Sequence, residues 1–366
     1  MPPPTGQPPQ IDRWLRELVQ RKASDLHLAA GRPPLLRLDG SLVALAPTVL
    51  DAPRLTQILA EMAGHHMSPF EENGDHDFAY SIAGLARFRV NFFRQENGPG
   101  AVMRVIPEKI LTLDDLGAPP ALHRLADLAG GLVLVTGPTG SGKSTTMAAV
   151  IDAINTKYSR HIITIEDPLE FVHPRKKSLL SQREIGQHAR SFAEALKSAV
   201  REDPDVLLVG EMRDRETIAL ALAAAEMGIL VFGTLHTNSA AKTIARVVDA
   251  FPEEEQPQAR ASLAESLGGV VAQLLMPRKE GKGRLAVHEI LLRTSALSNL
   301  IREGNTSMIA NAIQAGKSQG MQTMDDALFA AVKDGKVALE AVTDIVVDKK
   351  RFEAFKDPHG EPGPAA

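Results

Sequence analysis

Residues 137–144 read GPTGSGKS and match the pattern G-x-x-x-x-G-K-[ST] of loops that bind nucleotide phosphates. Glycines in such a loop let the backbone bend so that its amides face phosphate oxygens, and the helix N-terminus that follows favours negative charge. Lys143 would reach the β- and γ-phosphates, and the hydroxyl of Ser144 would hold Mg²⁺. We therefore predict that ATP binds to a loop made of Gly137, Pro138, Thr139, Gly140, Ser141, Gly142, Lys143, Ser144 and Thr145.

The flanks of this loop favour a nucleotide site over the alternative, an ordinary glycine-rich turn. An apolar run at residues 132–135 (LVLV) precedes the loop, and residues 145–154 (TTMAAVIDAI) can continue as a helix. Phosphate-binding loops of this type join a strand to a helix in the same way.

A second segment, residues 205–214 (DVLLVGEMRD), brings Glu211 to the end of another apolar run. Ligands of open parallel sheets gather at the carboxyl ends of the strands. A carboxylate there can orient water or hold the water shell of a metal ion. Taken alone, the segment also fits a buried strand with an exposed acidic end. Beside a phosphate-binding loop, we predict that Glu211 lies on the Mg²⁺ side of the site.

Two further apolar runs end in groups that can move protons. Residues 164–171 (TIEDPLEF) place Glu166 after one run, and residues 233–240 (GTLHTNSA) place His236 after the other. Glu166 is the first choice for the base that activates water, although Glu166 and Glu211 could exchange roles. A neutral imidazole at His236 could sense the γ-phosphate or bridge to Glu211, and a structural histidine is an equal alternative. The predicted catalytic residues are Glu166, Glu211, His236 and Lys143.

Arginines are concentrated in an alternating segment, residues 87–95 (RFRVNFFRQ), and Arg104 follows. Period-two spacing puts Arg87 and Arg89 on one face of a strand. These charges could protect a solvated edge strand against aggregation, or could be offered to a phosphate across a domain or subunit boundary. The sequence leaves both possibilities open.

The elements that carry these residues indicate two kinds of domain. Residues 11–110 combine a helical pattern at each of 11–19 and 55–62 with short alternating strands, which predicts a small α+β domain. Residues 111–122 are interpreted as a linker, which could be an ordered one. Residues 123–285 contain short continuous apolar runs separated by helical stretches, which is typical of buried parallel strands with crossover helices. The strands are expected to stop near residue 277, so that 286–366 form a helical region. The proline-rich residues 1–10 are expected to be disordered.

Composition limits the classes of protein that need to be considered. The 366 residues have a formal net charge of −4 and a pI near 6.3, which gives no overall attraction to nucleic acid. The absence of cysteine rules out disulfides and cysteine-ligated zinc. The N-terminus, MPPPTGQPPQ, lacks the apolar core of a signal peptide, and no apolar run approaches 18 residues. We expect a cytoplasmic α/β nucleotide-hydrolysing protein.

Together these segments resemble the secretion-type hexameric ATPases, and within them the type IV pilus retraction ATPase family, often called PilT-like. Residues 200–214 (VREDPDVLLVGEMRD) are similar to the family's signature around its Walker B glutamate. TIEDPLEFVH resembles its Asp box and GTLHTNSA its His box, and SDLHLAAGRPPLLRLDG and ARFRVNFF fall in the family's order and spacing. The resemblance extends from about residue 11 to about residue 352.

The resemblance implies an N-terminal PAS-like domain, a RecA-like P-loop domain and a helical C-terminal region. It also implies a homo-hexameric ring with nucleotide between the two domains and with arginines from neighbouring domains completing each site. Arg246 lies where the family has an arginine close to the nucleotide, and Arg104 is the N-terminal candidate. The implied activity is Mg²⁺-dependent ATP hydrolysis that drives pilus retraction and twitching motility. The implied setting is the cytoplasmic face of the inner membrane, with a membrane platform protein as partner, paralogous pilus ATPases as possible partners, and no nucleic acid.

Two departures from the family pattern bear on the mechanism. Ile229 stands where the family usually has a histidine, which weakens a two-histidine mechanism. ALSNLIRE (residues 296–303) replaces the family's A-I-R-N-L-I-R-E, so Ser298 removes a charge. An accessory paralogue is therefore one alternative to a retraction motor. A pilus extension or type II secretion ATPase and a RecA-like nucleic-acid motor are others, although the former usually carries a four-cysteine zinc motif.

Overall fold

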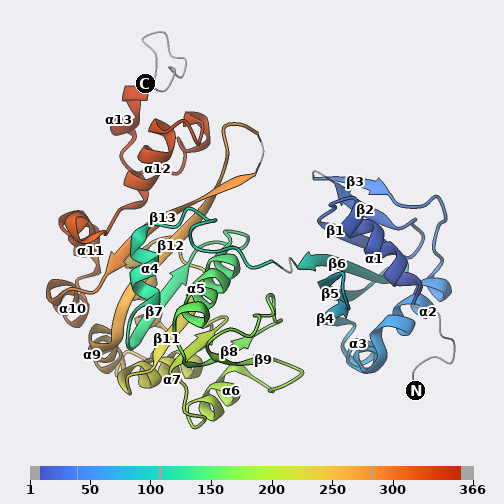
Figure 1. Cartoon of the computed structure of the whole chain (residues 1–366), viewed down its shortest axis with the longest axis horizontal. Helices are drawn as coiled ribbons and strands as arrows, with labels where there is room; N and C mark the ends of the chain where they lie inside the picture. The colour runs from blue at the N-terminus through green and yellow to red at the C-terminus, as the bar shows by residue number, and fades with distance from the viewer. Residues whose placement is uncertain (1–8, 39, 107–108, 282, 356–366) are drawn as a thin grey trace. The chain divides into compact units, whose positions relative to one another are not determined.

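The computed structural model of the protein describes residues 9–38, 40–106, 109–281 and 283–355. The chain divides into two compact units, each with its own sheet (Figure 1). The first unit comprises Met1–Lys109 with Pro168–Val172, and the second comprises Ile110–Asp167 with His173–Ala366. In these described ranges, no helix combines the length and the apolar character needed to cross a membrane. The expected disorder of residues 1–10 falls outside the described residues at 1–8, and Gln10 already belongs to a helix.

The first unit is built on a six-stranded antiparallel sheet with strand order β3-β2-β1-β6-β5-β4. Alternation decides its faces: along β5, Ala86, Phe88, Val90 and Phe92 are buried in the core, and the residues between them are partly exposed. The elements are α1 (Gln10–Gln20), β1 (Asp25–Ala29), β2 (Leu35–Leu38), β3 (Ser41–Ala44), α2 (Ala52–Ala63), η1 (Gly64–His66), α3 (Met67–Asn73), β4 (Asp75–Ile82), β5 (Ala86–Gln95) and β6 (Gly98–Ile106).

The second unit contains a seven-stranded sheet with order β13-β12-β7-β11-β10-β8-β9. All neighbouring strands are parallel except the edge pair β12 and β13. The elements of this sheet and its crossovers are α4 (Pro120–Ala126), β7 (Gly131–Thr136), α5 (Lys143–Lys157), β8 (His161–Glu166), β9 (Leu179–Glu184), α6 (Phe192–Ala199), β10 (Val206–Val209), α7 (Arg215–Glu226), β11 (Leu230–Leu235), α8 (Ala240–Asp249), α9 (Gln256–Ser266), β12 (Leu267–Pro277) and β13 (Arg284–Leu292).

Helices cover both faces of this sheet, which explains why its central strands read as continuous apolar runs (Figure 1). Val133 and Val135 of β7 pack with α4 and α5, whereas Leu132 and Leu134 pack on the opposite face with α6 to α9. The fold class predicted from the sequence is confirmed, because an α+β N-terminal part precedes a P-loop α/β part of the RecA-like type.

The C-terminal region continues as short helices packed on β12 and β13. Met276 and Val287 of these strands form one apolar cluster with Leu328, Val342 and Phe352. The elements are α10 (Ser295–Arg302), η2 (Thr306–Met308), α11 (Ile309–Ala315), η3 (Lys317–Gln319), α12 (Met324–Lys333), η4 (Leu339–Ala341), α13 (Lys349–Phe352) and η5 (Glu353–Phe355).

One predicted feature of the second unit is wrong. Strands do not stop near residue 277, because β13 runs over Arg284–Leu292, and the boundary placed between 285 and 286 falls inside that strand. A turn separates β12 from β13, so the sheet continues beyond the point where the prediction ends it. Residues 111–122, interpreted as a linker that could be ordered, are ordered: Leu113 is 2% exposed and packs in the same core as Leu122. Thr112 and Asp115 also cap each other's backbone amides, each at 3.0 Å.

Candidate active site

The loop that the sequence singled out joins β7 to α5. Three of its glycines lie in the left-handed region, with φ of 149° at Gly137, 78° at Gly140 and 86° at Gly142. A Cβ on Gly137 would also lie 2.3 Å from the backbone oxygen of Gln273 in β12. Backbone conformation and close packing therefore both require glycine where the loop leaves the sheet.

The polar side chains of the loop have three different surroundings. The ammonium of Lys143 donates hydrogen bonds to the carbonyl oxygens of Gly137 at 2.8 Å and Pro138 at 3.1 Å. Ser141 is buried, and its Oγ has no hydrogen-bond partner among the described residues. Ser144 is exposed in the first turn of α5. A cation, an orphaned hydroxyl and an exposed hydroxyl on one glycine-rich loop fit a phosphate chain and its metal ion.

The acidic groups and the histidine lie at the same edge of the sheet as this loop. Parallel pairing sets Val209 of β10 beside Gly233 of β11 and Ile165 of β8, so these strands end together. Backbone bonds continue past the strands: the amide of Gly210 donates to Ile165 at 2.8 Å, and the amide of Gly137 donates to Leu235 at 3.3 Å. The segments that carry Glu166, Glu211 and His236 therefore follow neighbouring strands in register, as the sequence predicted for ligands of a parallel sheet.

Glu211 is held by two basic side chains. Its Oε1 lies 2.9 Å from Nε2 of His236 and 2.5 Å from Nε of Arg213. Burial raises the pKa of Glu211, but hydrogen bonds and charges from Arg213 and His236 lower it by more, so the pKa lies below its ordinary value. Glu211 is therefore ionised at neutral pH and can act as a metal-side or water-orienting carboxylate. The predicted bridge from His236 to Glu211 is present, whereas Arg213 was missed.

Glu166 ends β8, and its Oε1 accepts a hydrogen bond from Oγ1 of the buried Thr164 at 2.7 Å. This contact fixes one carboxylate oxygen at the edge of the sheet. The division of roles between Glu166 and Glu211 stays a prediction.

Of the two arginines expected near the nucleotide, one is exposed and the other is paired with a buried aspartate. Arg246 is exposed in the last turn of α8. Arg104 belongs to the first unit, where its Nε donates to Oδ1 of the buried Asp25 at 2.8 Å. Burial raises the pKa of Asp25, but hydrogen bonds from Ser24 and Arg104 outweigh it and leave the pKa below its usual range. Arg104 therefore has a structural partner, and contact of either arginine with nucleotide stays a prediction.

A buried polar group behind the loop was also missed. Gln273 of β12 is 1% exposed and contacts both the loop and α5. The sequence carried a signal, because a single amide interrupts the apolar run VVAQLL.

The available oxygen donors suit Mg²⁺ better than a transition metal. Within the described ranges, no group of three or more histidine, aspartate or glutamate side chains is placed to hold a metal. Mg²⁺ in nucleotide sites is held by one or two protein oxygens together with phosphates and water. The Ser144 hydroxyl and the Glu211 carboxylate are groups of that kind.

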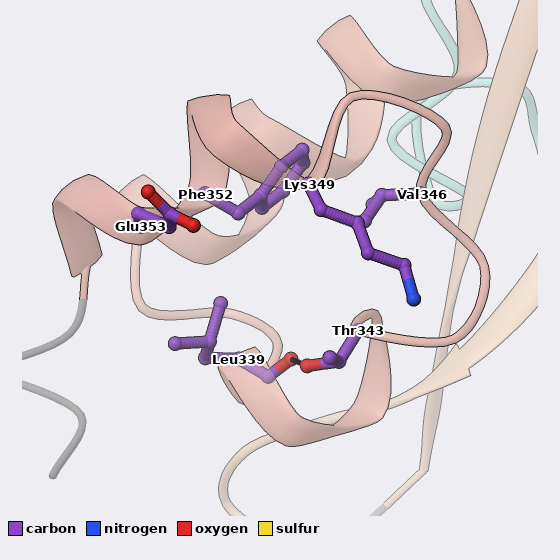
Figure 2. Close-up of a pocket in the computed structure, with 6 residues that line it drawn as sticks. All are labelled: Leu339, Thr343, Val346, Lys349, Phe352 and Glu353. Atoms are coloured by element: carbon purple, nitrogen blue, oxygen red, sulfur yellow. Dashed lines mark hydrogen bonds between the residues drawn. The ribbon is translucent and has the colours of Figure 1, made fainter. Parts of the chain in front are cut away.

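A small cavity elsewhere in the second unit does not resemble an active site. It measures about 140 Å³ and lies in the C-terminal region, lined by Leu339, Thr343, Val346, Lys349, Phe352 and Glu353. Figure 2 shows the Lys349 amine and the Glu353 carboxylate pointing to different sides of it. It is remote in sequence from the loop, Glu211 and His236.

A RecA-like sheet with a P-loop, and with carboxylates and a histidine at the same edge, defines a P-loop ATPase. The chain belongs to the family described as "Type II/IV secretion system protein", whose sequence profile matches residues 7–344.

Individual relatives narrow the comparison. The chain is 52% identical to the "Type IV pilus retractation ATPase PilT" of Pseudomonas aeruginosa over 331 residues, which is 90% of this chain and 96% of that protein. It is 50% identical to a "Twitching motility protein" of Neisseria gonorrhoeae, covering 84% of this chain and 83% of the relative. A crystal structure of the pilus retraction motor PilT with bound ADP superposes with a TM-score of 0.86 at 44% identity, covering 93% and 98% of the two chains.

Proposed function

We propose that this protein is an ATP-hydrolysing ring motor that drives retraction of type IV pili from the cytoplasmic face of the inner membrane. The observation that carries the proposal is similarity over nine-tenths of the chain to a retraction ATPase, 52% identical. The P-loop, Glu211 and His236 support it, because they are the parts that hydrolysis needs. Homo-hexamer formation and a membrane platform protein as partner belong to the same proposal.

In this proposal the loop amides and Lys143 bind the phosphates of ATP, and Ser144 and Glu211 hold Mg²⁺, which offsets phosphate charge. Glu166 orients the attacking water and accepts its proton, with Thr164 fixing the carboxylate. His236 keeps Glu211 in place beside Arg213. Arg246 of the second unit and Arg104 of a first unit would offset the remaining negative charge of the phosphates.

Rotation of the two units against each other would turn hydrolysis into movement. Residues 113–122 do not suit a pivot, because Leu113 and Leu122 pack in the core of the second unit. The pivot is expected on the N-terminal side of Leu113.

An accessory paralogue is the second candidate, and two positions favour it. Ile229 is partly buried against the core of the second unit. Its alkyl side chain cannot transfer a proton, so this position offers no second histidine to the site. Ser298 lies half-exposed on α10, where the family carries a charge that could contact a partner. Neither change touches the P-loop or Glu211.

Deletion of the gene with a count of surface pili tests the proposal. Excess pili that do not retract are expected, and wild-type protein should restore retraction whereas Lys143→Ala should not. Cells without pili would favour an extension ATPase, and unchanged retraction would favour the accessory role.

A further inference from the structure

Gln273 places a buried amide directly behind the P-loop. Its Nε2 donates to the carbonyl oxygen of Ser141 at 2.6 Å, and its Oε1 accepts from Oγ1 of Thr146 at 2.8 Å. Ser141 lies within the loop, whereas Thr146 lies in the first turns of α5. One side chain therefore joins the middle of the loop to the helix on which the phosphates would rest.

The partners of Gln273 fix which way its amide points. The carbonyl oxygen of Ser141 can only accept a hydrogen bond, so the NH₂ group must face it. Oε1 then faces Thr146 and, at 3.1 Å, Nε2 of His288 in β13. His288 must carry its proton on Nε2, and burial lowers the pKa of His288 to about 4, so the ring is neutral. Both polar atoms of the Gln273 amide therefore have hydrogen-bond partners, and the network does not titrate near neutral pH.

The backbone of β12 constrains the same loop. A Cβ added to Gly137 would lie 2.3 Å from the backbone carbonyl oxygen of Gln273. A Cβ added to Gly142 would lie 3.0 Å from the side-chain Nε2 of Gln273. Parallel pairing of Ala272 with Thr136 sets this register. Gln273 thus contacts the loop where it leaves β7, in its middle and where it enters α5.

We propose that Gln273 is a positioning residue that holds the P-loop in the shape required to bind nucleotide phosphates. This inference rests on the proposed nucleotide site at residues 137–145. Donors that are fixed before the ligand arrives cost no reorganisation on binding, so a loop held in this way binds more tightly. Because the β-phosphate is present in ATP and in ADP, the loop contributes to binding of substrate and product alike.

The test is Gln273→Met in the full-length protein, since methionine keeps the length and volume of the side chain without its polar atoms. We expect the Kd for ADP to rise about tenfold, equivalent to about 1.4 kcal/mol. In steady-state hydrolysis the KM for ATP should rise by a similar factor while kcat changes little, since the lost contribution is uniform binding.

Asn155→Leu is the matched control. Asn155 is a fully buried amide near the other end of α5, where its Nδ2 donates to Pro174 and its Oδ1 accepts from Ser178. Gln273→Met removes a buried amide that bonds to α5, and Asn155→Leu removes one that α5 itself carries, so both should lower the thermal unfolding midpoint. Only Gln273→Met should weaken ADP binding.

Thr146→Val removes one of the same hydrogen bonds with little change in shape, and serves alone if Gln273→Met does not fold. Its effect on the Kd for ADP should be smaller, and the double variant should bind no more weakly than Gln273→Met.

Wild-type ADP affinity in Gln273→Met or Thr146→Val, or an equal loss in Asn155→Leu, would overturn the inference. Lys143→Ala separates this failure from failure of the site itself. If Lys143→Ala also binds and hydrolyses normally, the nucleotide site at residues 137–145 is wrong. If Lys143→Ala is inactive while Gln273→Met binds normally, only the positioning role is wrong.

Discussion

The two halves of the catalytic edge are held by different physical means. Behind the P-loop, Gln273 and His288 are nearly inaccessible to solvent and neutral, and they act through hydrogen bonds. On the other half, Glu211 is held by Arg213 and His236, whose side chains are 75% and 46% exposed. Buried neutral bonds resist salt and pH, whereas exposed ion pairs are screened and titrate. The difference suggests a fixed phosphate cradle beside an adjustable carboxylate.

The largest effect is expected from the adjustable half. Glu211→Gln keeps the side-chain shape but removes its charge, and hydrolysis should fall by about 10²- to 10⁴-fold, the range for loss of a catalytic proton-transfer or charged group. ATP turnover measured over a range of Mg²⁺ concentrations tests this. Glu166→Gln is the paired variant. Raised Mg²⁺ should partly restore hydrolysis in the variant that lost the metal-side carboxylate, and should not restore it in the variant that lost the base. Turnover near the wild-type level in Glu211→Gln would end the assignment.

A smaller effect should follow from loss of Arg213. Since Arg213 lowers the pKa of Glu211, Arg213→Met should raise it. Activity that needs ionised Glu211 is lost as pH falls through this pKa, so the acid limb of the kcat/KM profile should move to higher pH. If the acid limb does not move, ionisation of Glu211 does not set the acid limb of the kcat/KM profile.

The smallest effect in the site should come from salt. Raising ionic strength to about 1 M shortens the Debye length to about 3 Å and screens the exposed partners of Glu211. Hydrolysis should fall modestly while ADP affinity retains the tenfold gap between wild type and Gln273→Met. If high salt instead makes the two Kd values for ADP equal, the hydrogen bonds of Gln273 are not insensitive to salt, and the proposed difference between the two halves is wrong.

A pair of leucines tests the boundary between the units. Leu113→Ala should cost about 2–5 kcal/mol of unfolding free energy, as large-to-small changes in a core do. Leu111→Ala, at a side chain that is 37% exposed, should stay within about 0.5 kcal/mol. Chemical denaturation of both variants measures the difference. Equal losses of unfolding free energy in the two variants would show that Leu113 does not stabilise the core of the second unit.

Local sequence was sufficient for the parts of the site that lie within one motif. The P-loop, Glu211 and His236 each follow a short continuous apolar run, and the helical stretches between those runs predicted parallel strands. β9 was missed because LLSQRE is mostly polar, as an edge strand allows, and β13 because a polar turn precedes it. Gln273 could not be assigned a role, since its partner Ser141 is 132 residues away in the chain. Arg213 is two residues from Glu211, but only side-chain geometry shows that they pair.

Steady-state ATP hydrolysis by the wild-type protein and by Lys143→Ala tests the central claim most directly. Lys143 begins α5, is partly exposed and contacts loop carbonyls, and its removal should leave the thermal unfolding midpoint close to that of the wild type. The account predicts Mg²⁺-dependent turnover in the wild type and a loss of about 10²-fold or more in Lys143→Ala, as removal of a donor at a developing charge does. Equal turnover by the two folded proteins would contradict it.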